Sequence, residues 1–163
     1  LPVKARRKSS DRSVWPNWRG PTRNGVATGS GYAVSWSQDD NIRWRVPLPG
    51  LGASTPAVWG DRLVLTCDIE GHDGVLCVDR DGNECWRQTL GDIRPGKHKK
   101  ATGCNSSPIT DGEHVWVYFK SGELACLRIS SAEPSFNRKR TPRAFLGTNN
   151  RRNPPARTKN KGP

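Results

Sequence analysis

The feature that most constrains this 163-residue chain is a stretch of sequence that occurs twice. The run STPAVWGDRLVL at residues 54–65 is echoed by SSPITDGEHVWV at 106–117, with Pro108 standing 52 positions after Pro56. A second pair, GVLC at 74–77 and GELA at 122–125, is offset by 48 positions. The difference falls in a predicted turn at 68–73, where an insertion costs little. A repeat of about 50 residues indicates an array of similar units.

Each repeat contains short strand-like runs. Apolar residues alternate with polar ones, or cluster between turns rich in Gly and Asp, and no helical period of useful length appears. The strands expected in the first repeat are residues 56–59, 63–67, 75–78 and 84–90. Four short strands per repeat predict propeller blades, because a single four-stranded sheet cannot bury both of its faces alone. A β-sandwich would explain the strands but not the repetition.

The predicted fold is therefore all-β, an incomplete β-propeller of about one and a half to two four-stranded antiparallel blades. We expect residues 53–90 to form one full blade and residues 107–127 to begin a second one beside it. Residues 42–48 (IRWRVPL) also alternate, and predict a half-buried strand that would lie against a blade absent from this chain.

The excess positive charge lies outside the predicted blades, in the two terminal segments. The formal net charge is +12, but residues 1–12 hold five Lys and Arg with one acid, and residues 128–163 hold ten with one acid. The rest of the chain is close to neutral. This composition predicts a disordered basic lead at 1–14, a folded region at 15–127 and a disordered basic tail at 128–163. A genuine tail, a misread frame and a truncation all remain open for the last segment.

The cysteines predict neither a metal site nor a defined set of disulfides. Their number, five, is odd, no two are spaced as CxxC, and the three histidines lie on separate segments. We expect several of these thiols to be buried as small apolar groups. No apolar run is long enough for a membrane-spanning helix, and no signal peptide is visible.

One run resembles a known family. Residues 77–86 (CVDRDGNECW) are similar to the blade-end signature of the PQQ-like β-propeller repeat family, in which a small residue, an Asp, a turn Gly and a Trp recur. Here the Asp, Gly and Trp are Asp79, Gly82 and Trp86. The stretch from Asp79 to Gly82 is one residue shorter than usual. The Ser/Thr-Pro openings of both repeats, Trp44 before a Pro-Gly link, and the start WPNWRGP at 15–21 resemble the same family.

The resemblance implies architecture more than activity. It implies an N-terminal fragment of a non-catalytic scaffold that binds proteins or a ligand in the bacterial cell envelope, periplasmic or secreted, similar to the outer-membrane lipoprotein that assists β-barrel assembly. Blade-end tryptophans would pack against neighbouring blades. The expected structural residues are Trp44, Pro56, Gly60, Asp79, Gly82, Trp86, Pro108, Gly112 and Gly122. No catalytic, cofactor-binding or metal-binding residue is predicted.

Two alternatives remain. A fragment of a quinoprotein dehydrogenase would bind pyrroloquinoline quinone and calcium through many blades, but most acids here lie in predicted turns and no two cysteines are adjacent. Electrostatic nucleic-acid binding through the basic tails is the second. Residues 128–163 offer only Phe136 and Phe145 for base stacking, which makes nucleic acid an unlikely partner.

Overall fold

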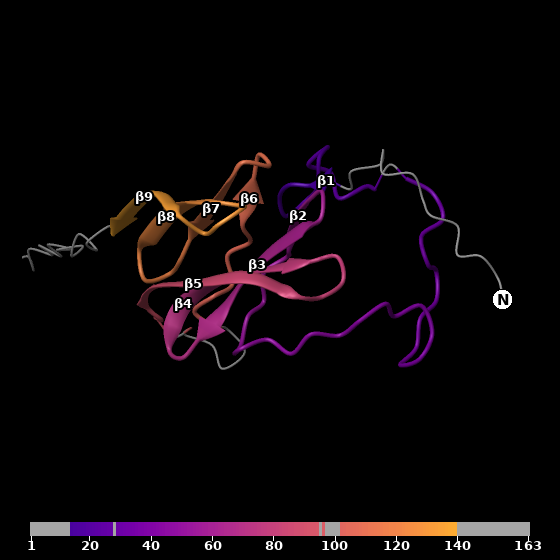
Figure 1. Ribbon diagram of the computed structural model, residues 1–163, viewed down its shortest axis with the longest axis horizontal. Coiled ribbons are helices and arrows are strands. Elements are labelled where there is room, and N and C mark those ends of the chain that lie inside the picture. Colours follow the sequence, from indigo (N-terminus) through magenta and orange to yellow (C-terminus); the bar gives the residue numbers. More distant parts are fainter. Residues whose placement is uncertain (1–13, 28, 95, 97–101, 140–163) are drawn as a thin grey trace, which may run out of the picture.

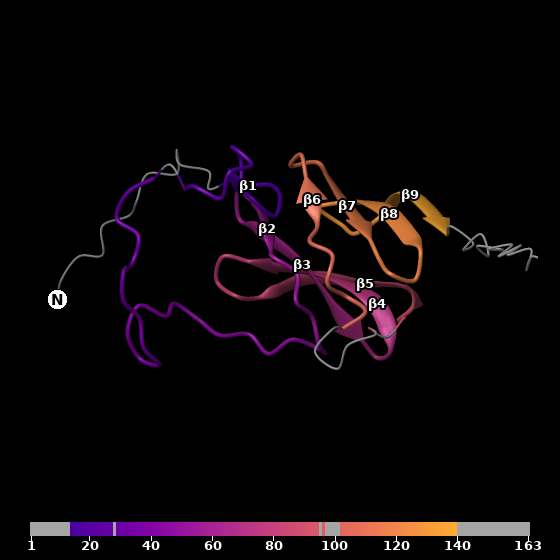
Figure 2. The same ribbon diagram turned by 180° about the vertical axis from the view of Figure 1, so that it is seen from behind.

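The computed structural model describes residues 14–27, 29–94, 96 and 102–139, and this part of the chain contains two antiparallel sheets and no helix. Sheet A has the strand order β1-β2-β3-β4-β5 and sheet B the order β6-β7-β8-β9. The two sheets pack side by side, and residues 29–41 run in a wide irregular arc away from them (Figures 1 and 2). The predicted all-β class is confirmed.

The described residues form nine strands, joined mostly by tight turns. They are β1 (Val14–Trp15), β2 (Ala57–Trp59), β3 (Arg62–Ile69), β4 (His72–Asp79), β5 (Glu84–Asp92), β6 (Ile109–Thr110), β7 (His114–Tyr118), β8 (Glu123–Arg128) and β9 (Pro134–Lys139).

Sheet A differs from the prediction in having five strands. The four strands expected between residues 53 and 90 are present as β2 to β5, but β1 adds to them. Val14 pairs with Trp59 and Trp15 with Val58. The edge of β2 would otherwise leave backbone N–H and C=O groups without partners, and a strand from the N-terminal segment pairs with them.

The first hairpins of the two sheets share one register. In sheet A, Val58 pairs with Leu63. In sheet B, 52 positions further on, Thr110 pairs with Val115. The sequence echo at residues 54–65 and 106–117 therefore corresponds to the same local structure in both sheets.

The next hairpins correct the predicted offset and the predicted turn. Leu63 pairs with Val78 and Val115 pairs with Leu127, so β8 follows β4 by 49 positions rather than 48. The strands β3 and β4 continue through 68–73, where we expected a loop, to a two-residue turn at Glu70 and Gly71. Both turn residues have positive φ, 54° and 83°, as a type I′ turn requires.

The third hairpins carry the same irregularity. The register shifts between Cys77 and Val78 where β4 meets β5, and between Cys126 and Leu127 where β8 meets β9. A β-bulge re-aims side chains and bends the strand. Its recurrence at matching positions is structural evidence of repetition that the sequence echo did not include.

The strand β9 lies inside the segment that we expected to be a tail from residue 128. Phe136 of β9 pairs with Cys126, as Trp86 of β5 pairs with Cys77. Pro134 and the neighbouring basic residues hid the strand period, but an edge strand tolerates both. The basic tail predicted for the remaining residues, 140–163, and most of the lead at 1–14 lie outside the described residues.

The predicted strand at 42–48 is wrong, because this segment forms no ladder. Its alternation is nevertheless real. Trp44 and Val46 are half-buried, whereas Arg43 and Arg45 are exposed. Trp44 packs on a small cluster of buried residues on sheet A, so the segment lies across a face of the sheet instead of joining its edge.

The main core lies between the two sheets. Its buried residues come from sheet A (Val64, Val75, Cys77), from sheet B (Val115, Val117, Ala125, Leu127) and from the connections (Cys104, Phe119, Ile129). One buried carboxylate also links sheet A to the connections around sheet B. Asp73 in β4 accepts hydrogen bonds from the Ser121 hydroxyl and, at 3.7 Å, from the Cys104 thiol. Apolar burial and polar contacts thus join the two sheets.

Candidate functional site

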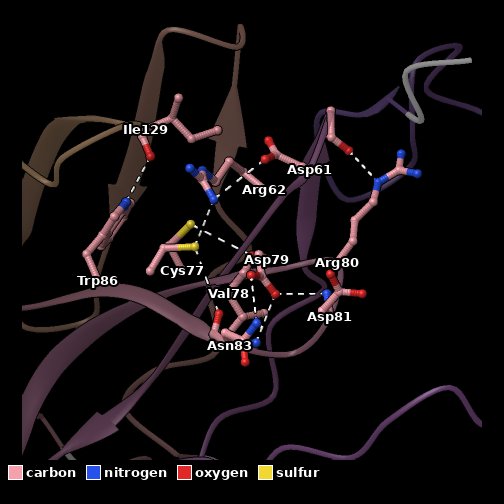
Figure 3. Close-up of polar contacts among 12 residues, drawn as sticks. Asp61, Arg62, Cys77, Val78, Asp79, Arg80, Asp81, Asn83, Trp86 and Ile129 are labelled. Carbon is pink, nitrogen blue, oxygen red and sulfur yellow. Dashed lines mark hydrogen bonds and ion pairs between the residues drawn. The ribbon is translucent and has the colours of Figure 1, made fainter. Parts of the chain in front are cut away.

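Trp86, predicted as a blade-end residue, links sheet A to sheet B. Its indole N–H donates a hydrogen bond to the carbonyl oxygen of Ile129, 2.8 Å away, at the start of the turn that leaves β8 (Figure 3). The indole also packs against the main core. A Trp side chain in this place combines apolar burial with a satisfied N–H group.

Trp44 makes the same kind of contact one unit earlier. Its indole N–H donates to the carbonyl oxygen of Arg80, 2.6 Å away. Arg80 stands 49 positions before Ile129, the spacing that relates β4 to β8. A Cβ atom added at Gly82 would lie 3.0 Å from the Trp44 ring, so this turn is covered closely by the indole. Two tryptophans therefore cap two equivalent hairpin turns.

Asp79 holds the first of these turns together. Its carboxylate accepts hydrogen bonds from the backbone N–H groups of Asp81 (2.8 Å) and Asn83 (2.9 Å), and from the Asn83 side-chain amide (3.0 Å) (Figure 3). The hydrogen bonds from Asn83 hold the pKa of Asp79 below its usual range. Gly82 supplies the positive φ of 86° that the turn needs.

The remaining predicted residues occupy strand starts and turns. Pro56 and Pro108 directly precede β2 and β6. Gly60, Gly112 and Gly122 all have positive φ. Gly112 is also a point of close approach, because an added Cβ would lie 2.2 Å from the Trp59 ring.

The sequence interpretation did not anticipate an open cleft of about 680 Å³ where the N-terminal segment meets the start of sheet B. Its lining is aromatic, amide and cationic, and it includes no Asp or Glu. The lining residues are Asn17, Trp18, Arg19, Arg23, Asn105, Ser107 and Ile109.

A glycine turn builds one wall of this cleft. Gly20 is buried with φ of 73°, and an added Cβ would lie 2.7 Å from the Trp15 ring. The Gly20 N–H donates to the Asn17 carbonyl (2.9 Å), and the Thr110 N–H of β6 donates to the Pro16 carbonyl (2.9 Å). The segment is thus fixed to sheet B, and Trp18 points outward with 65% of its surface exposed.

The cleft has the chemistry of a binding site. The Arg19 guanidinium lies 5.7 Å from the centre of the Trp18 ring, and Arg23 and Ile109 also line the cleft. Guanidinium groups recognise carboxylates and phosphates through paired hydrogen bonds. The density of Trp and Arg at 15–23 is a sequence signal that could have pointed to it.

Among the described residues, no group of three or more His, Cys, Asp or Glu side chains is placed to hold a metal ion. In that part of the chain there is also no helix long and apolar enough to cross a membrane. Four of the five cysteines are buried, as the sequence predicted, and Cys85 is the exception.

No family model matches the chain. Over 77 residues it is 34% identical to a protein named cardiac-type myosin-binding protein C, from Gallus gallus. The match covers 42% of this chain and 6% of that protein, so the chain spans a small part of this relative's length. The name of the relative describes a binding protein.

Proposed function

We propose that this chain is a non-catalytic scaffold built from successive PQQ-like β-propeller units, and that it binds a protein or peptide partner. The observation that carries the proposal is the repeated capping contact: the indole of Trp44 donates to the Arg80 carbonyl, and that of Trp86 to the Ile129 carbonyl. A contact that recurs between equivalent turns is what stacked units of one repeat array make with their neighbours.

The matching registers support the same architecture. The strand pairs of the first hairpins recur at 52 positions, and the bulges of the third hairpins recur between β4–β5 and β8–β9. A β-sandwich of two unrelated sheets gives no reason for this agreement. Such a scaffold presents loops on a rigid frame, as many binding proteins do.

The cleft at Trp18 is the binding site that we assign to the scaffold. Two guanidinium groups with no acid in the lining favour a carboxylate on the ligand. Trp18 and Ile109, exposed at 65% and 53%, favour an apolar side chain next to that carboxylate. A peptide with an apolar residue at a free C-terminus offers both groups. A non-enzymatic role also agrees with the binding function named for the Gallus gallus relative.

The experiment is a binding titration with matched peptides. A fluorescein-labelled peptide that ends in Leu with a free carboxylate is compared by anisotropy with the same peptide as its C-terminal amide. We expect the free acid to bind, and we expect Trp18→Ala or Arg23→Gln to weaken binding about tenfold or more. Trp36→Ala is the control, because Trp36 is 68% exposed outside the cleft. Equal binding of the acid and the amide, or unchanged binding by the cleft variants, would refute the assignment.

Two further binding experiments separate the alternative functions. Binding of pyrroloquinoline quinone in the presence of calcium, followed by its absorbance, would favour the quinoprotein alternative. Oligonucleotide binding that is steeply dependent on salt would favour the nucleic-acid alternative. A location in the cell envelope, periplasmic or secreted, remains part of the proposal.

A further inference from the structure

The bulge in the third hairpin of sheet A brings two thiols together. Cys77 pairs with Trp86 and Val78 with Glu84, which leaves Cys85 as the extra residue of β5 with no partner of its own in the ladder. The Cys85 thiol is close enough to Cys77 to help raise the pKa of that buried thiol. Figure 3 shows the Cys77 side chain beside Arg62, whose guanidinium donates to the Cys85 sulfur.

The two thiols differ in access. Cys77 is fully buried in the main core, whereas Cys85 is exposed. Nη1 of Arg62 donates to the Cys85 sulfur at 2.9 Å, and the Asp61 carboxylate is 3.7 Å from the same nitrogen. Arg62 thereby fixes the position of the exposed sulfur beside the buried one.

From this geometry we propose that Cys85 and Cys77 form a reversible disulfide by thiol–disulfide exchange, with Cys85 as the thiol that reacts with an external disulfide and Cys77 as the thiol that resolves it. In the first step the deprotonated Cys85 sulfur attacks one sulfur of the external disulfide. A mixed disulfide forms, the original S–S bond breaks, and one thiolate leaves. In the second step Cys77 loses its proton to solvent and attacks the Cys85 sulfur. The second thiolate leaves, so that two protein thiols are oxidised and one disulfide is reduced to two thiols.

The order of the steps follows from burial. Burial, together with the neighbouring Cys85 thiol, raises the pKa of Cys77 to about 12, so Cys77 stays protonated at neutral pH and does not meet external reagents first. Since the thiolate is the nucleophile, the exposed cysteine reacts first.

Sheet B provides an internal control. Cys126 occupies the place of Cys77, since it pairs with Phe136 beside the matching bulge, but the bulged residue there is Ser135. One unit therefore carries the thiol pair and the other carries a single buried thiol. The pair is not a consequence of the repeat itself.

The test uses the whole chain and oxidised glutathione at pH 7.5. We expect the wild type to lose two of its five thiols and to regain both on reduction. Trypsin cleaves after Arg62, Arg80 and Arg87, so mass spectrometry should recover peptide 81–87 joined to peptide 63–80 by one disulfide, and fragmentation should place that disulfide on Cys77 rather than Cys67. Cys77→Ser should instead accumulate glutathione on Cys85, and Cys85→Ser should keep all of its four remaining thiols.

A second variant keeps the test decisive if Cys77→Ser unfolds. Ser135→Cys should create a second linked pair with Cys126, again cleavable between its members at Arg128. Wild-type protein that accumulates unresolved glutathione on Cys85, or that links any other pair of cysteines, would overturn the proposal.

Discussion

At the scale of single residues, tryptophans connect distant parts of this chain, both through the hydrogen bonds of their indole N–H groups and through the apolar area that their rings bury. Trp44 and Trp86 each combine a half-buried ring with a hydrogen bond to a turn carbonyl. Trp18 and Trp36 are largely exposed. Some tryptophans therefore cap turns and others lie exposed on the surface, and only the tertiary structure distinguishes the two groups.

The capping bond of Trp86 can be tested by a substitution that keeps the ring. Trp86→Phe retains most of the apolar contact but leaves the Ile129 carbonyl without the indole N–H. We expect the free energy of unfolding to fall by about 1 kcal/mol, measured by urea denaturation. Trp36→Phe is the control and should change it little. Equal stability of the two variants would contradict the role of the hydrogen bond.

At the scale of elements, the hairpin turns are set by backbone conformation. Glu70 adopts a φ of 54° next to Gly71 in the β3–β4 turn. Asn tolerates this region far better than Glu, and Asn-Gly is the preferred pair for a type I′ turn.

Glu70→Asn should therefore stabilise the protein by about 0.5–1 kcal/mol, because it relieves backbone strain at this position. Thermal unfolding checks this. Glu70→Gln removes the same charge without the conformational preference, and it should give little or no gain. A gain of equal size from Gln would assign the effect to charge instead.

The Asp79 turn predicts a dependence on pH. Hydrogen bonds from Asn83 lower the pKa of Asp79, so the folded state favours the ionised carboxylate more than the unfolded chain does. This contribution to stability is complete above the unfolded pKa, about 3.9, and is lost as the pH falls below that value toward the lower folded pKa.

Asp79→Ala should reduce stability at pH 6, and the difference from the wild type should shrink as the pH falls to 3. Urea denaturation midpoints at the two pH values measure this. A difference that grows on acidification would contradict the assignment, because it would mean that the turn favours the protonated carboxyl group.

At the scale of the whole molecule, the two sheets depend on close approach as much as on apolar burial. Gly112 leaves no room for a side chain, because an added Cβ would lie 2.2 Å from the Trp59 ring on the other sheet, and its φ is 96°.

Gly112→Ala should lower the free energy of unfolding by about 2–4 kcal/mol, from backbone strain and overpacking together. Gly25→Ala is matched to it, since Gly25 has φ of 81° with no atom within 4 Å of an added Cβ; it should cost only the strain. Calorimetry compares the two.

The sequence predicted the strands β2 to β5 well, because Asp-Gly and Gly-Asp turns flank runs of clear period. It failed where tertiary contacts override local pattern. Residues 42–48 have the alternation of a strand but meet a sheet face, and β9 lacks a clear period but meets the open edge of β8. The echo at residues 54–65 and 106–117 could be read from one chain, and the two hairpins that it predicts share one register. For the cleft at Trp18 the sequence offered only the Trp and Arg residues of one wall, because its lining comes from residues 17–23 and 105–109, which only the fold brings together.

The outer edge of sheet B also has consequences for the isolated chain. The strand β9 is an edge of sheet B, and Phe136 on it is 49% exposed. Unpaired edges and exposed apolar faces favour association. We expect the isolated chain to be marginally stable and to self-associate at high concentration, which light scattering over a dilution series measures. A monomer with one sharp, cooperative unfolding transition at all concentrations would contradict this expectation.

The central claim is that the two sheets are successive units with equivalent turns, each capped by a tryptophan indole, and the nuclear Overhauser effects of the indole N–H protons test it most directly. In the ¹⁵N-labelled protein the Trp86 indole proton should show contacts to Ile129 and Ala132, and the Trp44 indole proton should show contacts to Arg80 and Gly82. Those two pairs of partners occupy matching places in the two turns. An indole of Trp44 or Trp86 that contacts neither turn would contradict the account.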